Sequence, residues 1–187
     1  MTPRAAATVI LMREADRGLE LLMVQRTPAA RFMAAHWVFP GGAVDAADGE
    51  GQAGLRAAAL RELSEETSIV LAAGSELVPF ARWITPAQSP IRFDTWFYLA
   101  GAPAAADPRV DGVEIVASRW VTAVAALEAA AGGDFLLALP TEKQLELLSS
   151  FTSTEDALAH ARARVEEIRP IEPRIEGSGP EARIVLE

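Results

Sequence analysis

Cysteine is absent from this chain of 187 residues, and Lys143 is the single lysine among 17 basic residues. The absence of cysteine excludes disulfides, thiolate nucleophiles and cysteine-ligated zinc or iron–sulfur sites. Basic residues are also too few to balance the acidic ones, so the net charge is -9 at pH 7 and the pI is near 4.8. Nucleic-acid binding needs clustered positive charge, so we expect no nucleic-acid partner.

Long hydrophobic runs are also missing. A membrane-spanning helix needs about 20 apolar residues, whereas the apolar run at residues 5–12 is followed at once by Arg13, Glu14 and Asp16. This run is too short to span a bilayer, and no cleavage region of a secretory signal follows it. We therefore expect a cytoplasmic protein with no membrane partner.

The remaining composition is that of a globular protein, with half of the residues apolar and 23% charged. The length suits one domain, residues 1–187, and the patterns predict a mixed α/β fold. Strands are expected at residues 5–12, 20–26, 76–84, 92–100 and 114–121. Helices are expected at residues 52–67, 122–131, 141–149 and 154–168.

Two segments rich in glycine and proline interrupt these elements. Pro40-Gly41-Gly42 is expected to form a tight turn. Near the end of the chain, two short β-like runs flank residues 177–180, so residues 170–187 are expected to form a hairpin or an arm.

The helix predicted at residues 52–67 ends in the sequence RELSEET, which holds three glutamates, Glu62, Glu65 and Glu66. Positions i, i+3 and i+4 lie on one side of a helix, so these carboxylates repel one another unless a cation lies among them. Mg²⁺ and Mn²⁺ prefer such oxygen ligands and bridge them to phosphate oxygens. The alternative is a solvated acidic helix face on which Arg61 pairs with Glu65.

The wider context favours the metal site. Phe39–Gly42 precedes the helix, and Ile69 follows it. With these residues the sequence resembles the Nudix hydrolase superfamily, whose signature is G-x5-E-x7-R-E-U-x-E-E-x-G-U, with U apolar. Gly42 corresponds to its first glycine, and the second half falls on Arg61, Glu62, Leu63, Glu65, Glu66 and Ile69.

The chain departs from this signature at two places. The signature has 13 residues between its first glycine and its arginine, whereas this chain has 18, and the first glutamate of the signature falls on Ala53. Asp48 or Glu50 in the lengthened loop is expected to replace that glutamate. The second glycine of the signature is Ser68 here, at a cost of about 1 kcal/mol if left-handed backbone geometry is kept.

The resemblance implies a Nudix α/β/α sandwich with a mixed sheet, in which the signature forms a loop–helix–loop. It implies metal-dependent hydrolysis of a nucleoside diphosphate linked to another group, with Mg²⁺ or Mn²⁺ as the cofactor. Glu62, Glu65 and Glu66 would bind the metal, with the Gly42 carbonyl as a candidate further ligand. Arg61 would orient a carboxylate, and Glu114 is a candidate base.

Upstream residues resemble the motif that accompanies this signature in coenzyme A diphosphatases. Arg26, Arg31 and Phe39–Gly42 match that motif at its spacings, whereas Thr27 and Ala35 replace its small residue and its glycine. Arg26 and Arg31 are therefore candidate substrate-binding residues for a phosphate-rich ligand such as coenzyme A. The alternative is a pair of surface arginines.

The stretch at residues 83–100 resembles the peroxisomal coenzyme A diphosphatases and their bacterial relatives. Within it, we expect Arg92 to brace Asp94.

Coenzyme A or acyl-coenzyme A is thus the leading substrate, and ADP-ribose or a nucleotide sugar is the alternative. The alternative that is not an enzyme is a Nudix domain that has lost catalysis and only binds a ligand. Members of the superfamily are often homodimers, so a homodimer is the oligomeric state that the resemblance suggests.

Overall fold

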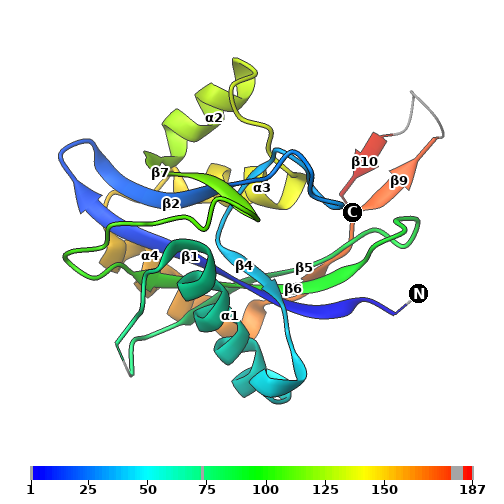
Figure 1. Cartoon of the computed structure of the whole chain (residues 1–187), viewed down its shortest axis with the longest axis horizontal. Coiled ribbons are helices and arrows are strands. Elements are labelled where there is room, and N and C mark those ends of the chain that lie inside the picture. Colours follow the sequence, from blue (N-terminus) through cyan, green and yellow to red (C-terminus); the bar gives the residue numbers. More distant parts are fainter. Residues whose placement is uncertain (1, 73, 178–182, 187) are drawn as a thin grey trace.

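The computed structural model describes residues 2–72, 74–177 and 183–186. Its strands and helices follow one another along the chain as Figure 1 labels them. The strands are β1 Arg4–Ala15, β2 Gly18–Arg26, β3 Trp37–Val38, β4 Gly41–Ala43, β5 Val78–Ile84, β6 Phe93–Gly101, β7 Ile115–Thr122, β8 Pro170–Ile171, β9 Arg174–Glu176 and β10 Arg183–Val185. The α-helices are α1 Gly51–Thr67, α2 Ala123–Ala131, α3 Leu139–Leu148 and α4 Thr154–Arg164.

Strand β1 organises a mixed sheet. Along one edge it pairs in parallel with β6, which pairs in turn with the antiparallel β5. Along its other edge β1 changes partner, because Ala6–Thr8 pair with β4 whereas Met12–Ala15 pair with β2. Strand β2 then leaves β1 and continues with β7 and β3 as its neighbours. The sheet therefore forks, with β2 and β7 on one branch and β4, β6 and β5 on the other (Figure 1).

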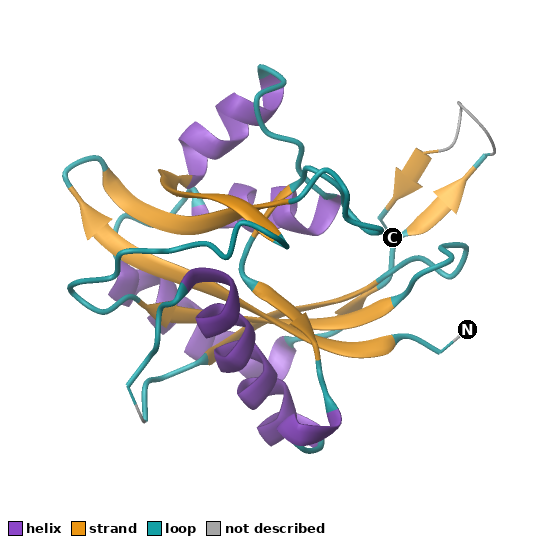
Figure 2. Cartoon of the chain, in the orientation of Figure 1, coloured by secondary structure: helices purple, strands orange, loops and turns teal. Residues whose placement is uncertain are grey.

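Helices cover both faces of the strand layer (Figure 2). The nearly unbroken run of buried apolar residues along β1 requires this, because successive side chains point to opposite faces of a strand. Val9 and Leu11 belong to the apolar cluster that includes Leu63 of α1. Ile10 and Met12 belong to a second cluster with residues of α2, α3 and α4. The predicted α/β/α sandwich with a mixed sheet is confirmed.

The region around Pro40-Gly41-Gly42 differs from the sequence-based expectation. We predicted a tight turn, but Gly41–Ala43 form the short strand β4. Gly41 lies so close to β1 that a Cβ atom there would be 2.5 Å from the Ala7 carbonyl oxygen. The absence of a side chain at Gly41 thus permits β4 to pair closely with β1. Glycine is needed here for this close approach and not for a turn.

The end of the chain contains the predicted hairpin strands. Strand β9 pairs with β10 in an antiparallel register, and the expected turn falls partly on residues 178–182, outside the described residues. Just before β9, the strand β8 pairs in parallel with β5 at the edge of the main sheet. The last helix is shorter than predicted, because α4 ends at Arg164 and a 3₁₀ turn, Val165–Glu167, follows it.

The expected partnership between Arg92 and Asp94 is wrong. Asp94 accepts hydrogen bonds from Nε and Nη2 of Arg82, at 2.8 and 2.6 Å, across the β5–β6 pair. Arg92 instead donates to the Thr85 carbonyl and forms an ion pair with Glu172. Sequence proximity did not reveal the strand register that brings Arg82 to Asp94.

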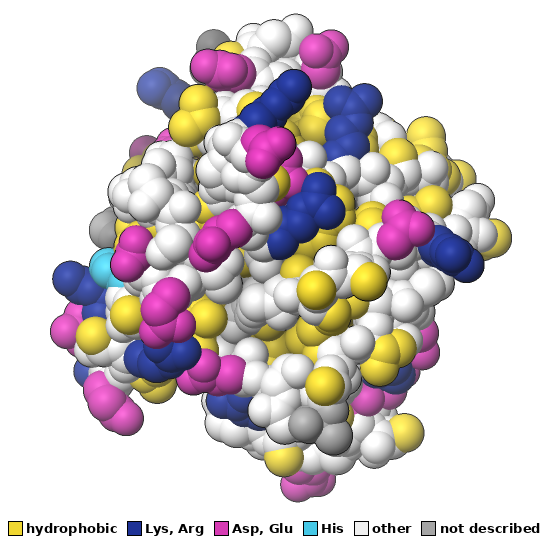
Figure 3. All heavy atoms as spheres, turned by 90° about the vertical axis from the view of Figure 1, so that its left-hand side faces the viewer, with side chains coloured by type: hydrophobic (Ala, Val, Ile, Leu, Met, Phe, Trp, Pro, Cys, Tyr) yellow, Lys and Arg dark blue, Asp and Glu magenta, His cyan; other side chains and the backbone are white. Residues whose placement is uncertain are grey.

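Acidic and basic side chains are interspersed on the face shown in Figure 3, with apolar side chains between them. Within the described part of the chain, no helix is both long enough and apolar enough to cross a bilayer.

Candidate active site

Helix α1 carries the candidate catalytic residues on one side. Its other side packs on the sheet and holds the helix in place. Leu55, Ala59 and Leu63 are buried against the sheet, and Gly54 is buried against the loop before the helix. Gly54 has no room for a side chain, because a Cβ atom there would lie 2.5 Å from the Gly49 carbonyl oxygen. The lengthened loop before the helix therefore packs directly on its first turns.

The helix ends where the signature glycine is replaced. Ser68 is the C-cap residue in the left-handed conformation, with φ 59° and ψ 10°, so this position keeps the geometry that usually selects glycine. Its N–H donates to the Ser64 carbonyl at 2.9 Å, and its Oγ donates to the Arg109 carbonyl at 3.2 Å. The hydroxyl bond offsets part of the backbone strain.

All five N–H donors of the Arg61 guanidinium are in use. Nε and one Nη2 hydrogen bind the carboxylate of Asp48, at 3.0 and 2.9 Å. The other Nη2 hydrogen binds the carbonyl of Ala43 at 3.0 Å, and Nη1 donates to Glu62 and Glu65, both at 2.9 Å. Arg61 therefore joins the loop before the helix to two of the three candidate glutamates.

Asp48 is the acidic residue of the lengthened loop that meets Arg61. It ends a 3₁₀ turn, Ala46–Asp48, and also accepts the N–H of Asp45 at 2.8 Å. Its side chain is 6% exposed. The hydrogen bonds from Arg61 lower the pKa of Asp48 below the usual range, and the hydrogen bond from the Asp45 N–H lowers it by a smaller amount. Glu50 is instead the exposed N-cap residue of α1, and Ala53 lies exposed in the first turn of that helix.

Glu62 and Glu66 lie against the strand β4. The carboxylate of Glu62 packs on Gly42 so closely that a Cβ atom there would clash with it. Glu66 is 5% exposed, and its Oε2 accepts the Gly41 N–H at 3.0 Å. The two glycines therefore act on different carboxylates. Gly42 leaves space for the Glu62 side chain, and Gly41 donates a backbone hydrogen bond to Glu66.

Burial has the largest effect on the electrostatics of Glu62 and Glu66. Burial raises the pKa of Glu66 to about 8, and the nearby Glu62 and Glu114 raise it further, whereas the Gly41 N–H and Arg26 oppose the shift. Burial also raises the pKa of Glu62, against the effect of its hydrogen bond from Arg61. A bound cation would favour the charged form of both.

The donor set suits a hard divalent cation, since it consists of carboxylate oxygens. In the described residues, however, no three acidic or histidine side chains converge on one point. On helix α1, Glu65 does not converge with the other two glutamates, because its side chain is 59% exposed and its Oε2 is bound to Arg61. Glu62 and Glu66, which both lie against β4, are the carboxylates that could hold a metal, and Glu65 would have to move away from Arg61 to join them.

Arg26 and Glu114 lie together at the same site, although 88 positions separate them in the sequence. Arg26 Nη2 donates to Glu114 Oε1 at 3.0 Å, and its Nε donates to the Phe32 carbonyl at 3.2 Å. Asp111 holds the loop before β7 by accepting the N–H groups of Val113, Glu114 and Ile115. This loop places Glu114 within electrostatic reach of Glu62 and Glu66.

Arg31 differs from Arg26 in its position. Arg26 lines a cavity beside Glu62 and Glu114, whereas Arg31 is exposed and is not among the residues that line this cavity. Of the two candidate substrate-binding arginines, only Arg26 thus lies at the carboxylate site in this conformation.

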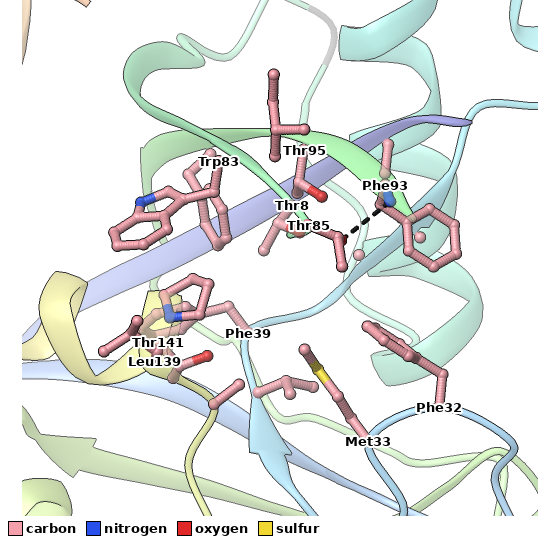
Figure 4. Close-up of a pocket in the computed structure, with 18 of the residues that line it drawn as sticks. Thr8, Phe32, Met33, Phe39, Trp83, Thr85, Phe93, Thr95, Leu139 and Thr141 are labelled. Atoms are coloured by element: carbon pink, nitrogen blue, oxygen red, sulfur yellow. Dashed lines mark hydrogen bonds between the residues drawn. The ribbon is translucent and has the colours of Figure 1, made fainter. Parts of the chain in front are cut away.

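The cavity has a volume of about 510 Å³ and lies between the two branches of the sheet. One end holds Glu62, Arg26 and Glu114, and the rest of the lining is largely apolar. Figure 4 shows side chains of β5 and β6 facing side chains of the loop before β3 and the start of α3. Labelled lining residues include Phe32, Met33, Phe39, Trp83, Phe93 and Leu139. Sequence reasoning missed this cavity, because aromatic residues in predicted strands are equally typical of a core.

The fold and the site together define an α/β protein whose acidic helix α1 contributes Glu62 to the lining of a cavity. The family model described as NUDIX domain matches residues 2–138, so the chain belongs to the Nudix family. The chain is 28% identical over 182 residues to a Caenorhabditis elegans protein named nudix hydrolase 7, with 78% of this chain and 60% of that protein covered. It is 47% identical over 66 residues to the Nudix hydrolase NudL of Klebsiella aerogenes, with 35% of this chain and 50% of that protein covered.

The chain therefore spans between half and three fifths of the length of these curated relatives. Among solved structures, a NUDIX hydrolase from Alicyclobacillus acidocaldarius superposes with a TM-score of 0.77 at 26% identity, covering 85% of this chain and 96% of that one. The NUDIX domain of Shewanella oneidensis NrtR, solved with ADP ribose, superposes with a TM-score of 0.59 at 19% identity, covering 78% and 86%. The second similarity concerns the fold alone.

Proposed function

We propose that this chain is a metal-dependent diphosphatase that hydrolyses a nucleoside diphosphate linked to another group. The observation that carries the proposal is the contact network of Arg61, which binds Glu62 and Glu65 directly beside the buried Glu66 and the cavity. Few structural roles need three neighbouring glutamates and one arginine on a helix that lines a cavity through Glu62, whereas phosphate chemistry with Mg²⁺ or Mn²⁺ does need such carboxylates.

The residues of the chain have distinct tasks in this proposal. Glu62, Glu65 and Glu66 would hold the metal, with the Gly42 carbonyl as the candidate further ligand. A cation held there would neutralise charge on the diphosphate and lower the pKa of a water molecule. Arg61 fixes the carboxylates through its bonds to Asp48 and Ala43. Glu114, oriented by Arg26 and Asp111, is the candidate acceptor for the proton of the attacking water.

Coenzyme A or an acyl-coenzyme A is the leading substrate. The support is the upstream motif with Arg26 and Arg31, together with a cavity that is charged at one end and apolar beyond it. Arg26 can meet a phosphate at that charged end. ADP-ribose is the second candidate, because the NrtR domain that shares this fold was solved with ADP ribose.

The experiment that tests the function is a screen of diphosphates with Mg²⁺ or Mn²⁺, with the products identified by mass spectrometry. Hydrolysis of coenzyme A compounds should release two phosphomonoesters and exceed that of ADP-ribose. A preference for ADP-ribose would select the alternative substrate. Binding without turnover of any diphosphate would instead identify a Nudix domain that only binds its ligand. Cell fractionation and size-exclusion chromatography would test the predicted cytoplasmic location and homodimer.

A further inference from the structure

The apolar end of the cavity is partly built by the last residues of the chain. Pro173, Ile175 of β9 and Ile184 of β10 line it, together with Trp83 and Phe93 of the main sheet. Ile184 is 55% exposed, although exposure of a large apolar side chain is unfavourable. A ligand in the cavity would cover it.

Contacts with strand β5 and with the segment between β5 and β6 hold this end segment in place. Strand β8 pairs with β5 so that Ile171 lies opposite Trp83. Arg92 forms an ion pair with Glu172, and Gln88 Nε2 donates to the Ile175 carbonyl at 3.4 Å. The hairpin β9–β10 follows directly and lies beside the ends of β5 and β6 (Figure 1). The hairpin β9–β10 therefore forms one wall of the cavity, and the pairing of β8 with β5 attaches it to the edge of the main sheet.

The lining of this end offers few polar contacts to a ligand. The rings of Phe32 and Phe93 lie 5.5 Å apart, and Trp83 lies on the other side of the opening (Figure 4). The hydroxyl of Thr85 already accepts the Phe93 N–H at 3.0 Å. Among the described lining residues, the charged ones are Arg26, Glu62 and Glu114, all at the carboxylate end. The cavity thus fits a ligand with a charged end and an apolar end.

We propose that the hairpin β9–β10 is a specificity element that selects diphosphates carrying an apolar chain, such as an acyl thioester, over the same molecule without that chain. The proposal rests on the proposed function, since the diphosphate is placed at Glu62 and Glu66. The apolar chain then extends past Trp83 and contacts Ile175 and Ile184. The hairpin contributes no group to the reaction and acts only through contact with the substrate.

The test compares octanoyl-coenzyme A with coenzyme A in the full chain. Ile175→Ser and Ile184→Ser should lower the ratio of kcat/KM for the acylated over the unacylated compound by on the order of tenfold, because apolar contacts are removed. Ile184→Trp should lower the same ratio by filling the cavity. Ile171→Ser is the matched control, because Ile171 is also a partly exposed isoleucine of this segment but does not line the cavity. Melting temperatures verify that each variant folds.

Binding provides a readout that does not require turnover. Calorimetric titration of Glu65→Gln protein with octanoyl-coenzyme A, coenzyme A and ADP-ribose should show tighter binding of the acylated compound, and the added Ile184→Ser change should remove that preference. Equal losses for all three ligands would overturn the proposal, because the hairpin would then contact the shared nucleotide part. Unchanged ratios in all folded variants would overturn it as well. Absence of hydrolysis with retained acyl preference would contradict the proposed function alone.

Discussion

Arg61 binds Asp48 through two parallel hydrogen bonds of 3.0 and 2.9 Å. Such a bidentate pair fixes the plane of the guanidinium and leaves Nη1 directed at Glu62 and Glu65. Asp48 therefore acts on the candidate metal site through Arg61, from a loop that is five residues longer than the family signature provides.

The substitution Asp48→Asn should weaken this arrangement. It removes the charge that faces Arg61, and loss of hydrogen bonds to a charged group costs about 1.5–3 kcal/mol. We expect a lower free energy of unfolding in urea and a drop in kcat of about tenfold. Glu50→Gln, in the same loop but without a side-chain cap bond, is the control and should change neither quantity. Equal effects of both substitutions would show that the loop as a whole is needed, and not the Asp48–Arg61 pair.

Glu65→Gln should lower kcat by orders of magnitude and leave the fold intact. The side chain is 59% exposed, so the loss of its charge removes a metal ligand at little cost in packing. Glu128→Gln, on an exposed position of α2, provides the control for a change of charge. Turnover numbers with the best substrate and melting temperatures measure the two effects. Unchanged turnover in Glu65→Gln would rule out this site.

The two candidate substrate-binding arginines should differ in their effects. Arg26→Ala should lower kcat/KM for every diphosphate, because Arg26 lies beside Glu62 and Glu114 in the cavity. Arg31→Ala should penalise coenzyme A more than 3′-dephospho-coenzyme A, because its exposed position suits the additional phosphate. Steady-state kinetics with both compounds measure the contrast. Equal losses in Arg31→Ala would remove the proposed contact with the 3′-phosphate.

The buried carboxyl of Glu66 predicts a pH dependence of the metal-free protein. Burial raises its pKa from the usual value of 4.5 to about 8, so the folded state holds a proton that the unfolded state lacks between these values. The free energy of unfolding should therefore fall as the pH rises from 4.5 to about 8 and level off above it, because the unfolded state binds fewer protons over that interval. Thermal melts in EDTA would measure this fall, and Mg²⁺ should offset it above pH 8 by binding the folded state.

The control for this pH dependence is Glu66→Gln, whose side chain is neutral at every pH. Its melting temperature in EDTA should vary less between pH 6 and pH 9 than that of the unaltered protein. Parallel profiles of the two proteins would contradict the raised pKa of Glu66.

Ser68→Gly should stabilise the protein. Ser68 has a left-handed backbone with φ 59°, which costs a residue with a side chain about 1–2 kcal/mol relative to glycine. Loss of the Oγ bond to Arg109 offsets part of this gain, so we expect up to about 1 kcal/mol from urea unfolding. Ser149→Gly is the matched control at the C-cap of α3, where φ is -62°, and it should destabilise. A loss of stability in both variants would show that the Oγ bond outweighs the strain.

The local part of the site could be predicted from the sequence because helical spacing is a local property. Arg61, Glu62, Glu65 and Glu66 lie within six positions, and their helix was predicted to within one residue of its observed start. For Ser68 the sequence indicated only the cost of a left-handed backbone if that geometry were kept, and the structure shows that it is kept. The same local reasoning failed at Gly41–Ala43, where pairing with a distant strand decides the conformation.

The sequence by itself determined the fold class, the acidic helix and the family pattern, because these depend on the periodicity and spacing of neighbouring residues. Only the tertiary structure decided that Asp48 rather than Glu50 meets Arg61, and that Arg26 lies with Glu114 at the carboxylates. The cavity also belongs to the tertiary structure, since the fork of the sheet brings the start of α3 and the last strands to one space. Contacts between residues far apart in the chain depend on strand register, which local patterns do not specify.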